Sequence, residues 1–177
     1  ALTLIGEGKV WSDNEPIDTL IALRDNGLIP VELMAKDGLS LINGTSQMCS
    51  FLSNAENVLG NLLPLADLIA CVSMEARECS IKPMDPRVHN VRPHYGQLLV
   101  AERITSIMAE SEILRSHKDC DKVQDAYSFR CIPQVHGAVM ESFRKLSNTL
   151  DIEINSATDN PLIFPNPSSP GKDEVVS

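Results

Sequence analysis

The chain has 177 residues, of which 43% are hydrophobic and 4% aromatic, and its formal net charge at pH 7 is −9. At roughly 150 residues per domain, this length suggests one domain. The acidic balance argues against a nucleic-acid partner, because such a surface needs excess lysine and arginine to displace counterions. The apolar residues are mostly aliphatic, which favours packed helices over sheets. We therefore expect an all-α, soluble, cytoplasmic protein.

The sequence shows no uninterrupted apolar run that is long enough to cross a bilayer and no basic-then-apolar leader, so we expect no membrane partner. The cysteines number five. Their odd count and irregular spacing argue against a disulfide framework. We expect reduced thiols, mostly buried as small apolar groups.

The first part of the chain is predicted to form short helices. One is expected from Asp13 or Asn14 to about Asp25, since either residue can cap a helix. A second is expected from Pro30 through Ala35. The opening letters, ALTLIGEGK, are typical of the tail of a helix, and the chain closes on a loop rich in Pro, Ser and Gly. We therefore expect a fragment of a longer polypeptide.

An apolar run then meets Asn43, Gly44 and Thr45. One interpretation is a turn that also caps the next helix, since all three residue types are favoured there. The alternative is that Gly44 lets the backbone approach a ligand while the amide of Asn43 points at it.

Three long helices are predicted over 46–77, 97–117 and 133–154, where apolar residues recur in steps of three and four. The first of them is apolar on more than one face, so other helices should enclose it. A piece of this size does not supply enough neighbours, which favours an oligomer.

Histidines at two places raise the question of a metal site. His89 and His94 lie in a Pro-rich connection, and His117 stands three residues before Cys120. Neither place offers a second pair of ligands at the spacing that zinc sites use. We expect structural histidines and no metal.

The most informative stretch is 122–137, KVQDAYSFRCIPQVHG. Its residues Gln124, Tyr127 and Arg130 recur at intervals of three, so on a helix they would share about a third of its circumference. Core-facing helices place aliphatic residues on such a stripe, and three large polar groups there suggest a ligand-binding surface. Pro133 suits the first turn of a helix. These three residues should therefore lie on a short turn or helix before a longer one.

Four stretches together resemble the histidine ammonia-lyases, which belong to the aromatic amino acid ammonia-lyase, or MIO-dependent, family. They are LINGT at 41–45, MDPRVHNVRPHYGQ at 84–97, the run at 116–138 that contains CDKVQDAYSFRC, and NSATDNPL at 155–162. They follow the family's order over nearly the whole chain. Their wording is closer to the histidine branch than to the plant phenylalanine branch.

The resemblance implies a fold and an activity. The family forms long kinked helices in a central bundle, the fumarase/aspartase-like architecture, and assembles as homotetramers whose active sites combine more than one subunit. Its members remove ammonia from an α-amino acid without oxidation, and from L-histidine the product is urocanate. The electrophile is a methylidene-imidazolone group (MIO) formed from an internal Ala-Ser-Gly. The chain is then expected to be a single fragment of the central helical domain, with short helices and the NGT turn in 1–45, bundle helices in 46–155 and a C-terminal loop in 156–177.

The resemblance also implies four residue roles. Asn43 matches the asparagine that hydrogen-bonds the cofactor and the reacting amine, and Gln124 the glutamine that lines the site. Tyr127 matches the tyrosine that assists proton or amine handling, and Arg130 the arginine that pairs with the substrate carboxylate. A planar guanidinium can grip a carboxylate through two hydrogen bonds. A free phenol has a pKa of about 10, so Tyr127 would need a lower pKa to act as a base near neutrality.

The sequence departs from the family because it contains no Ala-Ser-Gly. The resemblance also implies a tyrosine on a lid loop and a phenylalanine and a glutamate of the site, and this chain has no counterpart of these three. We therefore expect the chain to be inactive alone, whereas its parent polypeptide would be a carbon–nitrogen lyase. One alternative is the same chemistry on tyrosine or phenylalanine, or an aminomutase. Another is a non-catalytic helical assembly module.

Overall fold

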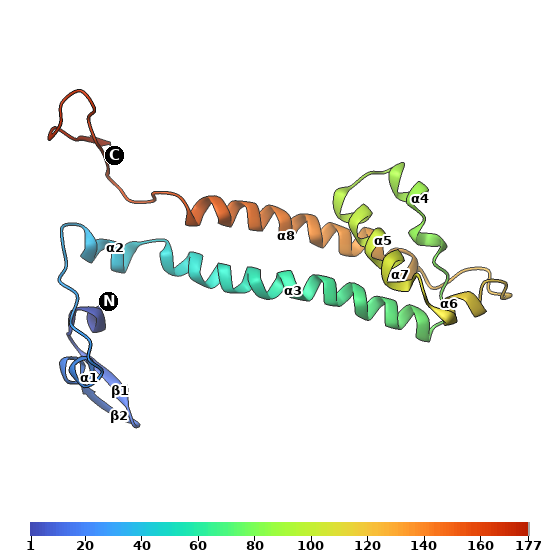
Figure 1. Cartoon of the computed structure of the whole chain (residues 1–177), viewed down its shortest axis with the longest axis horizontal. Helices are drawn as coiled ribbons and strands as arrows, with labels where there is room; N and C mark the ends of the chain where they lie inside the picture. The colour runs from blue at the N-terminus through green and yellow to red at the C-terminus, as the bar shows by residue number, and fades with distance from the viewer. Residues whose placement is uncertain (177) are drawn as a thin grey trace. The chain divides into compact units, whose positions relative to one another are not determined.

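The computed structural model describes residues 1–176 of the chain (Figure 1). The chain divides into two compact units, Ala1–Gln47 with Ser156–Ser177 and Met48–Asn155. Helices dominate the described residues, which confirms the predicted all-α class, and two short antiparallel hairpins accompany them. The last residue of the predicted C-terminal loop, 177, lies outside the described residues.

A β-hairpin occupies the first half of the first predicted helix, so that prediction is wrong there. The strands β1 (Lys9–Ser12) and β2 (Glu15–Asp18) pair antiparallel. Asp13 and Asn14 form the two-residue turn between them, with φ of 49° and 67°. Aspartate and asparagine tolerate this left-handed geometry, which two-residue hairpins require and helices exclude.

The helix α1 (Thr19–Asp25) confirms the second half of the predicted helix. Its cap is Asp18, whose carboxylate accepts the Leu20 N–H at 2.9 Å. The unit also contains the 3-10 helix η1 (Leu2–Ile5) and a hairpin of β3 (Leu162–Phe164) with β4 (Glu174–Val176).

Residues 30–35 form no helix, contrary to the prediction. The Val31 N–H instead donates to the Leu4 carbonyl at 2.8 Å, which holds this stretch against the start of the chain. The helix α2 (Asp37–Asn43) follows directly after Lys36, whose φ of 75° makes the turn into it. The Asp-Gly pair at 37–38 begins this helix.

The second unit contains the predicted long helices. They are α3 (Ser46–Ala76), α5 (Tyr95–Met108) and α8 (Ile132–Ile154), and the short elements between them are η2 (Lys82–Met84), α4 (Pro86–Asn90), α6 (Glu112–Ser116) and α7 (Tyr127–Arg130). The first and third predicted helices are confirmed to within one residue. The second breaks after Met108, because Ser111 caps a new helix by accepting the Leu114 N–H at 3.0 Å.

The helices α3 and α8 lie side by side in opposite directions (Figure 1). Three contacts fix their register: Ser147 Oγ donates to Glu56 Oε1 at 2.8 Å, Phe143 Cζ lies 3.5 Å from where a Cβ would stand on Gly60, and His136 Nδ1 meets Asp67 Oδ1 at 2.7 Å. The contacts advance by four and then seven residues along α3 and retreat by the same steps along α8. This is the repeat of an antiparallel helical seam.

A buried carboxylate joins three helices of this unit. Asp67 on α3 has a side chain that is 1% exposed, and it binds Arg103 Nη1 on α5 at 2.5 Å and His136 Nδ1 on α8 at 2.7 Å. A buried carboxylate needs such partners, because desolvation penalises an unpaired charge. These two contacts therefore fix how the three helices are rotated against one another.

The helices α5 and α8 touch through their backbones. Gly96 and Gly137 face each other, and a Cβ built on Gly96 would stand 2.1 Å from the Gly137 carbonyl oxygen. Beside this crossing lies the hydrophobic core, formed by Cys71, Met74, Cys79, Met84, Val100, Ile104, Met108 and Ile132. The core rests on aliphatic and sulfur side chains, as the low aromatic content predicts.

The helix α3 leaves many large apolar side chains exposed on this chain. They are Met48, Phe51, Leu52, Val58, Leu59, Leu62, Leu65, Leu68, Ile69 and Val72. By length and composition α3 could cross a membrane, a property that the search for uninterrupted apolar runs missed. Its buried Asp67 and its polar contacts with α8 are those of a helix packed against other helices.

Candidate functional site

The short helix α7 carries two of the four predicted site residues. Tyr127 and Arg130 stand three positions apart on it, and the Arg130 guanidinium carbon lies 5.4 Å from the centre of the Tyr127 ring. A cation over an aromatic face at this distance is attracted by the ring quadrupole. Pro133 lies in the first turn of the next helix, α8, as predicted. The expected order of a short helix followed by a long one is therefore confirmed.

Gln124 is not helical, so the three polar residues do not form one helical stripe. It lies in the irregular stretch before α7, with an exposed side chain. It nevertheless lines the same pocket as Arg130, a space of about 230 Å³. The loop brings together the two residues that helix periodicity was expected to align. Tyr127 is 71% exposed beside them.

Arg130 is oriented by one hydrogen bond to the backbone. Its Nε donates to the Asp125 carbonyl at 3.0 Å. The hydrogen bonds of residues 1–176 leave the two terminal nitrogens of this guanidinium without an acceptor. A planar guanidinium held through Nε presents its two outer nitrogens as a fork, which matches the two oxygens of a carboxylate.

The pocket beside Arg130 is rich in charged groups. Lys82, Lys122 and His117 line it together with Glu78 and Asp125. Lys122 bonds to the chain at the end of α3, and His117 Nε2 lies 2.9 Å from Glu78 Oε2. Arg130 therefore shares this pocket with basic and acidic side chains, of which Lys122 and His117 already have partners within the chain.

Asn43 lies in the other unit, as the last residue of α2. Its side chain is exposed, and its amide has no hydrogen-bond partner within the part of the chain that the structure describes. Gly44 follows, and a Cβ there would meet the Ser40 carbonyl oxygen at 2.6 Å. The glycine is therefore required by close approach of the chain's own backbone.

The turn after Asn43 is tied to a distant loop of the same unit. Thr45 Oγ1 lies 3.2 Å from Thr158 Oγ1. Lys36, just before α2, forms an ion pair with Asp159 and donates to the Pro161 carbonyl. The ion pair lowers the pKa of Asp159, chiefly through the hydrogen bond from Lys36. Two stretches that the sequence singled out separately, LINGT and NSATDNPL, are thus in contact.

His89 has two structural partners. His89 is buried, its Nε2 lies 2.9 Å from the Pro83 carbonyl and its Nδ1 lies 2.9 Å from Gln97 Nε2. Since the carbonyl can only accept and the amide nitrogen can only donate, the ring is neutral with its proton on Nε2. Within residues 1–176 no group of three or more His, Cys, Asp or Glu side chains could hold a metal ion.

Sequence reasoning missed two residues of this region, Lys122 and Asp125. Both bind backbone groups about 45 residues away, near the end of α3. No local pattern signals such contacts. The only local sign was the spacing of three residues between Lys122 and Asp125, which suits an ion pair between them.

Known proteins match this chain along its whole length. The family model described as aromatic amino acid lyase matches residues 1–177. The histidine ammonia-lyase of Sorangium cellulosum is 44% identical over 177 residues, which is 100% of this chain and 34% of that protein. The chain therefore spans about a third of the length of that relative.

Solved structures agree with this similarity. The histidine ammonia-lyase of Trypanosoma cruzi matches with a TM-score of 0.80 and 37% identity, over 99% of this chain and 32% of that chain. The tyrosine aminomutase of Streptomyces globisporus matches with a TM-score of 0.82 and 36% identity, over 98% of this chain and 36% of that chain. The predicted helical ammonia-lyase architecture is thereby confirmed.

Proposed function

Because the chain belongs to the aromatic amino acid lyase family, we propose that it is a segment of a histidine ammonia-lyase, which releases ammonia from L-histidine and leaves urocanate. The observation that carries this proposal is the Tyr127–Arg130 pair on α7, with a guanidinium fork that has no acceptor among residues 1–176. The first relative reported above, at 44% identity, is a histidine ammonia-lyase, which favours histidine over other amino acids.

In this proposal the residues of the chain bind and orient the substrate. Arg130 holds the α-carboxylate through its two outer nitrogens, because the hydrogen bonds and the charge both favour an anion there. Tyr127 lies on the same short helix, and its ring packs against this guanidinium. Its hydroxyl is therefore close to the bound substrate, where it handles the proton or the amine. Holding the substrate in one geometry lowers the entropic part of the barrier.

In this proposal Asn43 in one unit and Gln124 in the other are each a candidate to hydrogen-bond the family's cofactor, MIO. Asn43 and Gln124 are exposed, and each amide can donate and accept hydrogen bonds, as a polar imidazolone ring requires. When present, MIO supplies the electrophile that the reacting amine needs. The sequence has no Ala-Ser-Gly to form it, so we expect no activity from this chain alone.

We also propose that the active protein is a cytoplasmic homotetramer. On α3 ten large apolar side chains are exposed, such as Phe51 and Leu62. They need a partner surface to cover them. The five free cysteines suit a reducing compartment.

The test is urocanate formation by the full-length protein that carries this chain, followed by absorbance. Arg130→Ala should lower kcat/KM for L-histidine roughly 10²-fold, because two hydrogen bonds to a charged group are worth about 3 kcal/mol together. Arg144→Ala is the matched control, since Arg144 also stacks on a tyrosine, 4.5 Å from the ring centre of Tyr95. Equal losses in both variants would refute the role of Arg130.

A second candidate is an aminomutase or lyase acting on tyrosine, favoured by the match to the tyrosine aminomutase. Assaying the full-length protein on L-histidine and L-tyrosine in parallel separates the two. A protein that turns over neither amino acid would support the non-catalytic helical module.

A further inference from the structure

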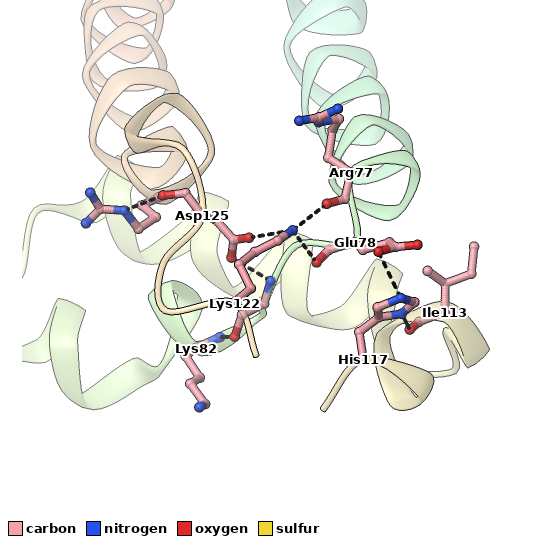
Figure 2. A network of polar contacts seen from close by, with 9 residues as sticks. Arg77, Glu78, Lys82, Ile113, His117, Lys122 and Asp125 are labelled. Atoms are coloured by element: carbon pink, nitrogen blue, oxygen red, sulfur yellow. Dashed lines mark hydrogen bonds and ion pairs between the residues drawn. The ribbon is translucent and has the colours of Figure 1, made fainter. Parts of the chain in front are cut away.

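A polar network joins the loop before α7 to the end of α3 (Figure 2). Lys122 Nζ donates to the carbonyls of Arg77 at 2.8 Å and Glu78 at 3.1 Å, just beyond the last residue of α3. It also lies 3.5 Å from Asp125 Oδ1. Carbonyls at the end of a helix lack partners within it and carry partial negative charge, so an ammonium group stabilises them.

Asp125 is the centre of this network. Its side chain is only 5% exposed, and Oδ2 accepts the Ser80 N–H at 2.7 Å. Within residues 1–176 the other oxygen, Oδ1, lies 3.5 Å from Lys122 Nζ and has no hydrogen bond. The same carboxylate adjoins the Cys79 thiol, whose pKa is raised by burial and by Asp125. A carboxylate so enclosed is held by its partners, because leaving it without them would expose an unpaired charge to a poorly solvated site.

The backbone of Asp125 faces Arg130. Its carbonyl accepts the Arg130 Nε–H at 3.0 Å, and Figure 2 shows the carboxylate and the carbonyl directed to different partners. Asp125 therefore binds the end of α3 through its side chain and the guanidinium through its main chain. Anything that fixes the side chain also fixes the carbonyl that orients Arg130.

We propose that Asp125 is a positioning residue for substrate binding: its carboxylate, held by the Ser80 N–H and the Lys122 ammonium, fixes the carbonyl that directs the Arg130 fork. This rests on the proposed role of Arg130 as carboxylate binder. Because Nε is engaged by the protein, Arg130 meets the carboxylate end-on through its two outer nitrogens.

A double-mutant cycle in the full-length protein tests this with L-histidine as the probe. Asp125→Ala should raise KM about tenfold, the size of one lost hydrogen bond, with a much smaller change in kcat. In the Arg130→Ala background the same substitution should leave KM unchanged, because the group it positions is gone. A purely structural aspartate would lower activity by the same factor in both backgrounds, and that result would overturn the proposal.

The cycle separates this inference from the proposed function. If Arg130→Ala alone leaves KM unchanged, the carboxylate role of Arg130 is wrong, and this inference falls with it. If Arg130→Ala raises KM and Asp125→Ala does not, only the positioning role is wrong.

Two further variants control for loss of folding. Asp125→Asn keeps an acceptor for Ser80 and should raise KM less than Asp125→Ala, so it tests the proposal even if the alanine variant is unfolded. Asp85→Ala removes a carboxylate that accepts a backbone N–H at 2.9 Å, that of Arg87, in a different part of the unit. It should leave KM unchanged.

Hydrogen exchange tests the contact between Asp125 and Ser80 directly. In the 177-residue chain, amide exchange at Ser80 should accelerate in Asp125→Ala, and an unchanged rate would refute the contact.

Discussion

The backbone contact between α5 and α8 makes Gly137→Ala a sharp test of the fold. The added Cβ would stand 2.5 Å from the backbone nitrogen of Gln97, 2.7 Å from its Cα and 2.7 Å from the Gly96 carbonyl carbon. These are backbone atoms, which cannot rotate away as a flexible side chain can. The two helices would have to separate by roughly 1 Å to restore ordinary carbon contacts.

The magnitude follows from two opposing effects. Overpacking of this kind costs about 3 kcal/mol, since the neighbours cannot yield without a helix shift. Replacing glycine by alanine inside a helix recovers about 1 kcal/mol of helix propensity. We therefore expect Gly137→Ala to lower the free energy of unfolding by about 2 kcal/mol.

Gly60→Ala is the matched control. Gly60 is also inside a long helix, but its added Cβ would meet Phe143 Cζ at 3.5 Å, an ordinary contact. We expect this variant to be more stable than the unsubstituted chain by up to about 1 kcal/mol. Urea unfolding followed by far-ultraviolet circular dichroism measures both. If the two variants have the same stability, α5 and α8 do not cross at their glycines.

Three further predictions concern ionisable groups and activity. In Lys36→Met the pKa of Asp159 should rise towards its ordinary value in an NMR titration, because Lys36 lowers it. A lowered carboxyl pKa stabilises the fold at pH values above the ordinary pKa, and this contribution is lost as pH falls. The variant should therefore be less stable than the unsubstituted chain at neutral pH and equally stable in acid, and an unchanged pKa of Asp159 would refute the pair. Burial, aided by Asp67, raises the pKa of Cys71 to about 11. At pH 8 iodoacetamide should therefore label Cys71 far more slowly than the exposed Cys120, a difference that urea should abolish, as mass spectrometry can show. The purified chain alone should release no urocanate from L-histidine, and any release would contradict the need for an Ala-Ser-Gly supplied elsewhere.

The long helices were predictable because their signal is local. Steps of three and four in apolar residues located α3 and α8 to within one residue, and Pro133 marked the start of α8. The hairpin was missed because Asp13 and Asn14 are equally good as helix caps and as residues of a left-handed turn. Val10 and Ile17, which face each other across the hairpin, were the signal that favoured strands.

The residues of the candidate site stay a prediction from the sequence, and their geometry differs in part from the one expected. The spacing of Gln124, Tyr127 and Arg130 pointed to a ligand surface, yet Gln124 joins it from an irregular stretch rather than from a helix. Lys122 and Asp125 act through contacts about 45 residues away. Such contacts depend on how α3 ends against the later loop, which no window of neighbouring residues encodes.

The distance along the chain between α3 and α8 has a consequence for synthesis. About 80 residues separate the end of α3 at Ala76 from the end of α8 at Ile154. At about 5–20 residues per second, a ribosome needs roughly 4–16 s to complete α8 after α3 is made. During this interval the face of α3 that packs against α8 lacks its partner helix, so a chaperone that binds apolar segments can bind this face of the nascent chain.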